Sequence, residues 1–145
     1  MIKTEKEYKE AKSRLEKEFK DIEAHELKMK KAGMSEEHIH LALDPLASFA
    51  HQLQEEVEEY EKIKRGQFDE IENLQGLGRL LIALRISKGV KQKDLAGRLK
   101  VKESQVSRDE NNEYHGASID KVQNVLDALG VTLKSTIEND LRQAI

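Results

Sequence analysis

The sequence predicts an all-α protein in which an N-terminal antiparallel helical hairpin precedes a compact bundle of shorter helices. Apolar residues in the first 66 positions recur mostly in steps of three, four or seven, which is the spacing of a helical stripe. From about residue 77 onward this spacing tightens, and glycines divide the chain into shorter segments. Apolar and polar residues alternate only over 131–138, so a short C-terminal β-strand is a candidate there.

The composition sets the limits for this fold. A chain of 145 residues forms one ordinary domain or two very small ones, and 37% apolar residues suffice for a modest core. The absence of Cys excludes disulfides, thiolate zinc sites and cysteine nucleophiles. The longest apolar run, residues 80–84, is far too short to span a membrane, and the first residues lack a secretory apolar stretch. We therefore expect a cytoplasmic protein without membrane contact.

The first predicted helix begins after Thr4 and ends at Gly33. Thr4 and Glu7 have the spacing of a capping box, and Gly33 can adopt the positive φ that follows a last helical turn. The apolar stripe between them comprises Tyr8, Ala11, Leu15, Phe19, Ile22 and Met29. These residues give the helix one apolar face and leave charged residues on the others.

The second arm of the hairpin is predicted in two pieces. Ser35 can cap a short helical segment that extends to about Leu43. Asp44 as N-cap and Pro45 at the first helical position then predict a new helix, which ends at Gly66. Its stripe comprises Leu46, Phe49, Leu53, Val57, Tyr60 and Ile63. Two helices alone have a thin core, so we expect the hairpin to pack on a second copy or on a partner.

The second half of the chain predicts four short helices and a tail. The helices are expected near 77–88, 92–99, 103–111 and 118–129. A strand over 131–138 could not satisfy its own backbone groups, so its expected mate is the same strand of another subunit. The predicted organisation is a hairpin over 1–66, a linker over 67–75, a compact domain of short helices over 76–131, and a candidate strand and tail over 132–145.

Charge is distributed unevenly along the chain. The formal net charge is −3, but residues 1–75 hold 13 Lys or Arg and 19 Asp or Glu, whereas residues 76–145 hold 12 and 9. Residues 79–108 alone contain nine basic and two acidic residues. Such a basic segment in a short helical domain is typical of a protein that binds a polyanion, although a solvated helix face has the same composition.

Residues 92–110 have the pattern of two short helices joined by a tight turn. Leu95, Ala96 and Leu99 form one apolar face, and Val101 and Val106 are expected to face the same core. Ala96 is small at the point where two such helices would cross steeply. This is a helix-turn-helix arrangement, and its second helix exposes polar side chains that can hydrogen-bond base edges or phosphates.

The stretch resembles the helix-turn-helix family of lambdoid phage repressors and Cro, known as XRE. The resemblance covers about residues 77–131, and five pieces of sequence carry it in order. They are Ala83-Leu84-Arg85, Gly89-Val90, Gln92-x-x-Leu95-Ala96, Val106-Ser107-x-x-Glu110 and Leu126-x-x-Leu129-Gly130-Val131. The resemblance implies that residues 76–131 form a helical domain that binds double-stranded DNA.

The resemblance also implies roles for individual residues. Four residues would read bases in the major groove: Lys102, Glu103, Ser104 and Arg108. Six would contact backbone phosphates: Lys91, Gln92, Lys93, Gln105, Ser107 and Asn111. Arg85 and Glu110 would form a largely buried ion pair that ties the first helix of the domain to the end of the recognition helix.

Two positions depart from the family pattern. Lys100 occupies the turn position that usually holds Gly, and a left-handed backbone there costs Lys roughly 1 kcal/mol. Asp109 occupies a position that is usually apolar, and Arg108, Arg79 and Tyr114 are its expected neighbours. Tyr114 itself is expected to be a packing residue.

Catalytic, metal and cofactor sites are not predicted. His38 and His40 lie two residues apart and therefore do not share a helix face, and no further ligand has a suitable spacing. The other histidines have no Ser or Asp at a catalytic spacing, and Gly76-Leu77-Gly78 lacks the third glycine of a phosphate-binding loop.

Two functions of different classes remain open. The first is a dimeric transcriptional repressor that reads a palindromic operator with residues 103–111, dimerising through the hairpin or the C-terminal strand. The second is an antitoxin of HigA type that binds a basic toxin through the acidic hairpin and represses its own operon. A structural helical adaptor is a third alternative, which the polar recognition helix disfavours.

Overall fold

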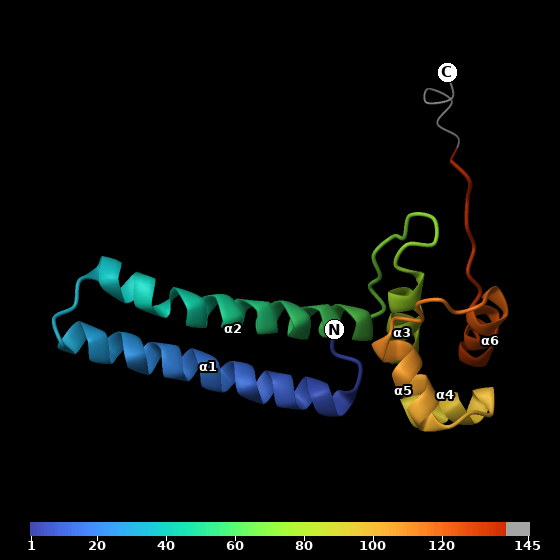
Figure 1. Ribbon diagram of the computed structural model, residues 1–145, viewed down its shortest axis with the longest axis horizontal. Helices are drawn as coiled ribbons and strands as arrows, with labels where there is room; N and C mark the ends of the chain where they lie inside the picture. Colours follow the sequence, from blue (N-terminus) through green and yellow to red (C-terminus); the bar gives the residue numbers. More distant parts are fainter. Residues whose placement is uncertain (139–145) are drawn as a thin grey trace, which may run out of the picture.

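The structure, a computed structural model that describes residues 1–138, contains six α-helices in that range and no β-strand. They are α1 (Glu5–Lys31), α2 (Glu36–Lys64), α3 (Leu77–Ser87), α4 (Gln92–Leu99), α5 (Glu103–Asn111) and α6 (Ile119–Leu129). Figure 1 shows α1 and α2 side by side and antiparallel, with the four shorter helices gathered at the end of the hairpin where α1 begins and α2 ends. The predicted all-α architecture is confirmed.

Helix α1 starts and ends as its sequence predicts. The Thr4 side chain accepts a hydrogen bond from the Glu7 backbone N–H, and the Glu7 carboxylate accepts one from the Thr4 backbone, which completes the capping box. Gly33 follows the helix with a φ of +78°. The apolar stripe faces α2, but no residue of α1 is fully buried. The hairpin core is therefore thin over most of its length.

Helix α2 is one continuous helix, so the predicted break at Asp44 is wrong. It begins after Ser35, whose side chain caps the helix at the His38 N–H, and it continues through Pro45. Ile39, Leu43 and Ala50 are buried on the same face, which means that the apolar stripe keeps its helical register across the proline. Packing of that face outweighs the roughly 3 kcal/mol that a proline costs inside a helix.

Two tyrosines join the helices at the base of the hairpin. The rings of Tyr8 and Tyr60 stack with their centroids 4.9 Å apart. The Tyr8 hydroxyl donates to Glu61 Oε1 at 2.6 Å, and the Tyr60 hydroxyl donates to Glu5 Oε2 at 3.1 Å. Burial and the Glu5 carboxylate raise the pKa of Tyr60 to about 12, so this hydroxyl remains a donor at neutral pH.

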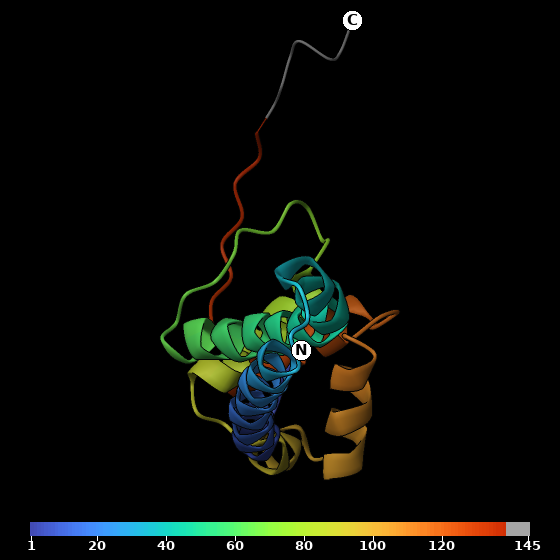
Figure 2. The ribbon, with the colours of Figure 1, turned by 90° about the vertical axis from the view of Figure 1, so that its left-hand side faces the viewer.

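One hydrophobic core extends through the short helices and the base of the hairpin. Its centre is α3, in which Leu81 and Ile82 have no exposed surface, and it includes residues of α4, α5 and α6. The same core contains Ile2 from the N-terminal segment and Val57, Tyr60 and Ile63 from α2. Figure 2, viewed along the hairpin from its tip, shows the shorter helices packed around the end that lies away from the viewer. The hairpin is thus anchored to the bundle by apolar burial.

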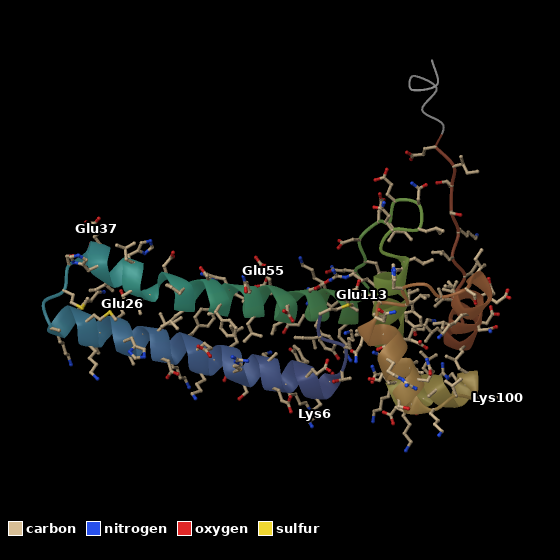
Figure 3. All side chains as sticks on the ribbon, in the orientation of Figure 1. Lys6, Glu26, Glu37, Glu55, Lys100 and Glu113 are labelled. Atoms are coloured by element: carbon tan, nitrogen blue, oxygen red, sulfur yellow. The ribbon has the colours of Figure 1, made fainter. Side chains whose placement is uncertain are left out.

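The start of α3 touches the loop that follows α5. A Cβ atom at Gly78 would lie only 1.8 Å from the Glu113 carbonyl oxygen, so the backbones approach as closely as glycine permits. Figure 3 shows Glu113 beside the end of α2 and the start of α3. This contact holds the loop of residues 112–116, which connects α5 to α6.

The structure of the C-terminal segment differs from the expected β-strand. Residues 131–138 follow Gly130 without regular structure, so the candidate strand is absent from this range. A strand needs a neighbouring strand for its backbone groups, and the described part of this chain offers none. The rest of the predicted tail, residues 139–145, lies outside the described residues. None of the helices described over residues 1–138 combines the length and apolarity needed to cross a bilayer.

Candidate nucleic-acid interface

Helices α4 and α5 pack against each other through small and aliphatic side chains. Leu95, Ala96 and Val106 are each at most 2% exposed. Because Ala96 has no bulk beyond Cβ, the two short helices can cross closely. Val101 was expected in the same core but is 43% exposed, so it lies at the surface of the turn instead.

The turn between α4 and α5 is closed by a Schellman motif. The Val101 N–H donates to the Ala96 carbonyl at 3.0 Å, and the Lys100 N–H donates to the Gly97 carbonyl at 3.2 Å. Lys100 has a φ of +56°, in the left-handed region that favours glycine. Figure 3 shows Lys100 at the end of the bundle farthest from the tip of the hairpin. Lys100 thus keeps a strained backbone together with an exposed charge.

Arg85 and Glu110 lie together in the interior. Both are nearly inaccessible, at 3% and 0% exposure, and the guanidinium is bidentate: Nε donates to Glu110 Oε1, and Nη2 donates to Oε2 at 2.8 Å. The remaining donors of Arg85 reach the backbone carbonyls of Val90 and Lys3, each at 2.8 Å. Among the described residues, no buried side-chain nitrogen or oxygen lacks a partner.

Gln92 joins this buried network. Its side-chain Nε2 donates to Glu110 Oε2 at 2.7 Å, and the residue is half-buried. One of the two amide hydrogens of Gln92 is used within the protein, and the phosphate contact expected from the sequence stays a prediction. What Gln92 does in the fold is to tie the first turn of α4 to the buried end of α5.

The exposed face of α5 is polar and continuous. Ser104, Arg108 and Asn111 follow at i, i+4 and i+7, opposite the buried Val106 and Glu110. Lys102 and Glu103, at the start of the helix, are also exposed. All four residues that the sequence assigns to base reading are therefore exposed, Lys102 and Glu103 at the start of α5 and Ser104 and Arg108 along its polar face.

Three further residues on α5 are partly buried or bonded within the domain. Gln105 Nε2 donates to Asp109 Oδ1 at 3.0 Å, while its Oε1 accepts from Arg108 Nη2 at 3.2 Å. Asp109 also pairs with Lys121 Nζ of α6 at 2.7 Å, and this partner was not among those expected. Ser107 is half-buried. Arg108 is thus held by its neighbour while its side chain stays exposed.

The N-terminal ends of α4 and α5 lie open among lysines. Lys91 and Lys102 occupy the two N-cap positions, and neither helix has a side-chain cap hydrogen bond. Lys91, Lys93 and Lys102 are exposed. Uncapped amides at a positive helix terminus, flanked by ammonium groups, are suited to phosphate oxygens.

Not every basic residue of the segment faces solvent. Arg98 Nη1 donates to the Ala128 carbonyl at 2.9 Å, so it secures α4 to the end of α6. Arg79 Nη2 donates to Glu59 Oε1 at 2.9 Å, so it secures α3 to α2. With Arg85 buried, three of the four arginines in 79–108 hold the fold. Arg79 and Arg98 remain exposed while they make these bonds, and with the lysines and Arg108 they contribute to the positive surface.

One contact near α5 was not foreseen from the sequence. Lys3 Nζ donates to Asn111 Oδ1 at 3.2 Å, which brings the N-terminal segment to the end of α5. Tyr114 follows α5 with a φ of +54° and is 8% exposed, in keeping with its expected packing role. Burial, with the nearby Glu110 and Asp109 carboxylates, raises the pKa of its hydroxyl.

Among residues 1–138, no group of His, Asp and Glu is arranged to hold a metal ion.

Removal of one partner from the buried ion pair is expected to destabilise the fold. Glu110→Gln leaves the Arg85 charge uncompensated in the interior, which costs about 3–5 kcal/mol of unfolding free energy. Chemical denaturation followed by circular dichroism measures the loss. Glu103→Gln, on the exposed side of the same helix, is the matched control and should change stability by less than about 0.5 kcal/mol. Equal melting temperatures for wild type and Glu110→Gln would refute the expected role.

Lys100 allows backbone strain to be separated from charge. Lys100→Gly should raise the unfolding free energy by about 1 kcal/mol, because glycine adopts the left-handed conformation without strain. Lys100→Ala removes the same charge but keeps the strained Cβ, so its stability should stay close to that of wild type. Denaturant titration of the three proteins tests this, and equal stabilisation by Ala and Gly would show that the charge, not the backbone, sets the cost.

Comparison with known proteins identifies the part of the chain that holds this site. Residues 76–136 match the family model described as a helix-turn-helix domain. Neither the search of curated proteins nor the search of solved structures found a match. The matched range contains α3 to α6 and every exposed residue of the α4–α5 surface. The part of the chain that carries the α4–α5 surface is therefore similar to a helix-turn-helix domain.

Proposed function

We propose that the protein is a sequence-specific DNA-binding regulator of transcription of the XRE type. The observation that supports it most is the α4–turn–α5 unit, whose buried Leu95, Ala96 and Val106 leave a polar face of α5 exposed. A helix of this width fits the major groove of B-DNA. The unit lies in the range that matches a helix-turn-helix domain.

The exposed residues of α5 have the chemistry for reading bases. Lys102 and Arg108 can donate to guanine O6 and N7, whereas Glu103 can accept from the cytosine amino group. Ser104 can donate or accept. Lys91, Lys93, Ser107 and Asn111, with the open amides of α4 and α5, would hold backbone phosphates. Gln92 and Gln105 would act chiefly by positioning their neighbours, because both bond within the domain.

A dimeric repressor is the form of regulator that we propose. Two copies would place their α5 helices in successive major grooves about 34 Å apart on a palindromic operator and block a promoter. The far end of the hairpin supports self-association, because several large apolar side chains there are 37–55% exposed: Phe19, Leu27, Met34, Leu46 and Phe49. An apolar face that one hairpin cannot close can be covered by a second copy.

An antitoxin of HigA type is the second candidate. The acidic residues of the hairpin favour it, because they are concentrated on α2 and the linker: residues 55–72 hold eight Asp or Glu and three Lys or Arg. Such a surface could neutralise a small basic toxin while the helix-turn-helix domain represses the operon. A gene for a small basic protein next to this one would favour the antitoxin, and an isolated gene would favour the plain regulator.

A double substitution on α5 tests the reading surface. An operator is first selected from a random duplex pool with the purified protein. Lys102→Ala with Arg108→Ala should then abolish the preference for that operator over random duplex, a loss of roughly 1–3 kcal/mol per residue. Both side chains are exposed, so the melting temperature should hardly change.

The matched control removes the same charge elsewhere. Lys9→Ala with Lys20→Ala, two exposed positions on α1, should keep the full discrimination. Log affinity should also fall with log salt by about 0.9 per phosphate contact. If the α5 variant still preferred the operator over random duplex as strongly as wild type, the proposed reading surface would be wrong. An affinity that did not depend on salt would count against DNA binding altogether.

A further inference from the structure

A groove of about 610 Å³ lies between the second half of α2, the linker and α3. It is separate from the α4–α5 surface, and nothing in the proposed reading of DNA uses it. Its walls come from residues 55–63 of α2, residues 67–76 and the first turns of α3. The linker therefore forms one wall of the groove as well as connecting α2 to α3.

The floor of the groove is apolar. Phe68 lies in the linker with 40% of its surface exposed, although the linker is otherwise largely polar. Ile71 and Leu80, both half-buried, and the buried Ile63 complete the apolar lining. A partly exposed aromatic ring among aliphatic side chains can serve as an anchor site for a partner's apolar residues.

The rim of the groove is strongly acidic. Six carboxylates line it: Glu55, Glu58, Glu59, Asp69, Glu70 and Glu72. Of the two basic side chains in the lining, Lys62 and Arg79, Arg79 is already paired with Glu59. The concave shape and the surplus of carboxylates together concentrate negative potential over the apolar floor.

The groove and the reading helix are on different sides of the molecule. Figures 1 and 2 both show the linker rising on one side of the bundle, with α4 and α5 toward the opposite side. Figure 3 shows Glu55 on the side of α2 that faces away from α1. An occupant of the groove would therefore leave the polar face of α5 accessible.

We propose that this acid-rimmed groove docks a basic amphipathic helix of a partner protein. Its apolar side chains would rest on Phe68 and its neighbours, and its Lys or Arg residues would face the rim, which is the helix-in-groove mode of recognition. Charge complementarity identifies the occupant. A second copy is a poorer fit. The exposed basic surface on α4 and α5 is polar and lacks an apolar stripe, and the nine basic residues of α1 are interspersed with eight acidic ones, which the rim would repel. The inference does not depend on the DNA-binding function, whereas the antitoxin candidate relies on the same acidic residues.

A synthetic amphipathic helical peptide of Leu and Lys, with a fluorescent label, is the probe. Fluorescence anisotropy measures its binding to the full chain, and a Leu/Glu peptide of the same spacing is the charge control. Rim variant Glu55→Lys with Glu70→Lys and floor variant Phe68→Ser should each weaken Leu/Lys binding by about tenfold or more. The Leu/Glu peptide should not bind.

A matched variant separates the groove from bulk charge. Glu16→Lys with Glu23→Lys changes the same charge at exposed positions of α1 and should alter the affinity less than about twofold. The rim substitutions are at exposed positions and should leave the fold and operator binding intact, which keeps this test independent of the proposed function. The proposal would be overturned if the α1 variant weakened binding as much as the rim variant, or if the two peptides bound equally well. It would also be overturned if the protein self-associated and Phe68→Ser dissociated it.

Discussion

The buried ion pair between Arg85 and Glu110 is the interaction on which the rest of the structure depends. It joins α3, the centre of the core, to the last turn of α5, and its spare hydrogen-bonding groups bind the backbone at Val90 and Lys3 and the side chain of Gln92. A pair with no exposed surface tolerates little displacement, because a separated charge has no water to stabilise it. The direction of α5, and so of its polar face, is fixed from inside the domain.

The same interaction explains why the hairpin belongs to the bundle. The Lys3 carbonyl accepts from Arg85, and next to it Ile2 is buried in the common core with residues at the end of α2. The far end of the hairpin has no such support, since α1 has no fully buried residue. The chain thus has a rigid end, which carries both the α4–α5 surface and the acid-rimmed groove, and a thinly packed arm whose apolar face remains partly open.

The sequence predicted best what depends on local spacing. The Thr4 cap, the α4–α5 unit and the left-handed Lys100 follow from nearby residues and from the family pattern. The break at Pro45 was wrong because a strong local start signal was weighed above an apolar stripe that continues in register from Ile39 to Ile63. Arg98 and Arg79 bond to residues 30 and 20 positions away, which no local pattern reveals. The groove lined by Phe68 forms only where α2, the linker and α3 meet, so it could not be predicted from local spacing either.

The central claim is that one core, organised by the Arg85–Glu110 pair, makes the hairpin base and the bundle of α3 to α6 a single folding unit. Native-state hydrogen exchange, read by mass spectrometry across a denaturant series, tests it most directly. We expect amides in residues 57–63 of α2 to open with the same free energy as those of α3 and α5, and amides at the far end of the hairpin to open more easily. Loss of protection in residues 57–63 well before α3 would contradict the claim.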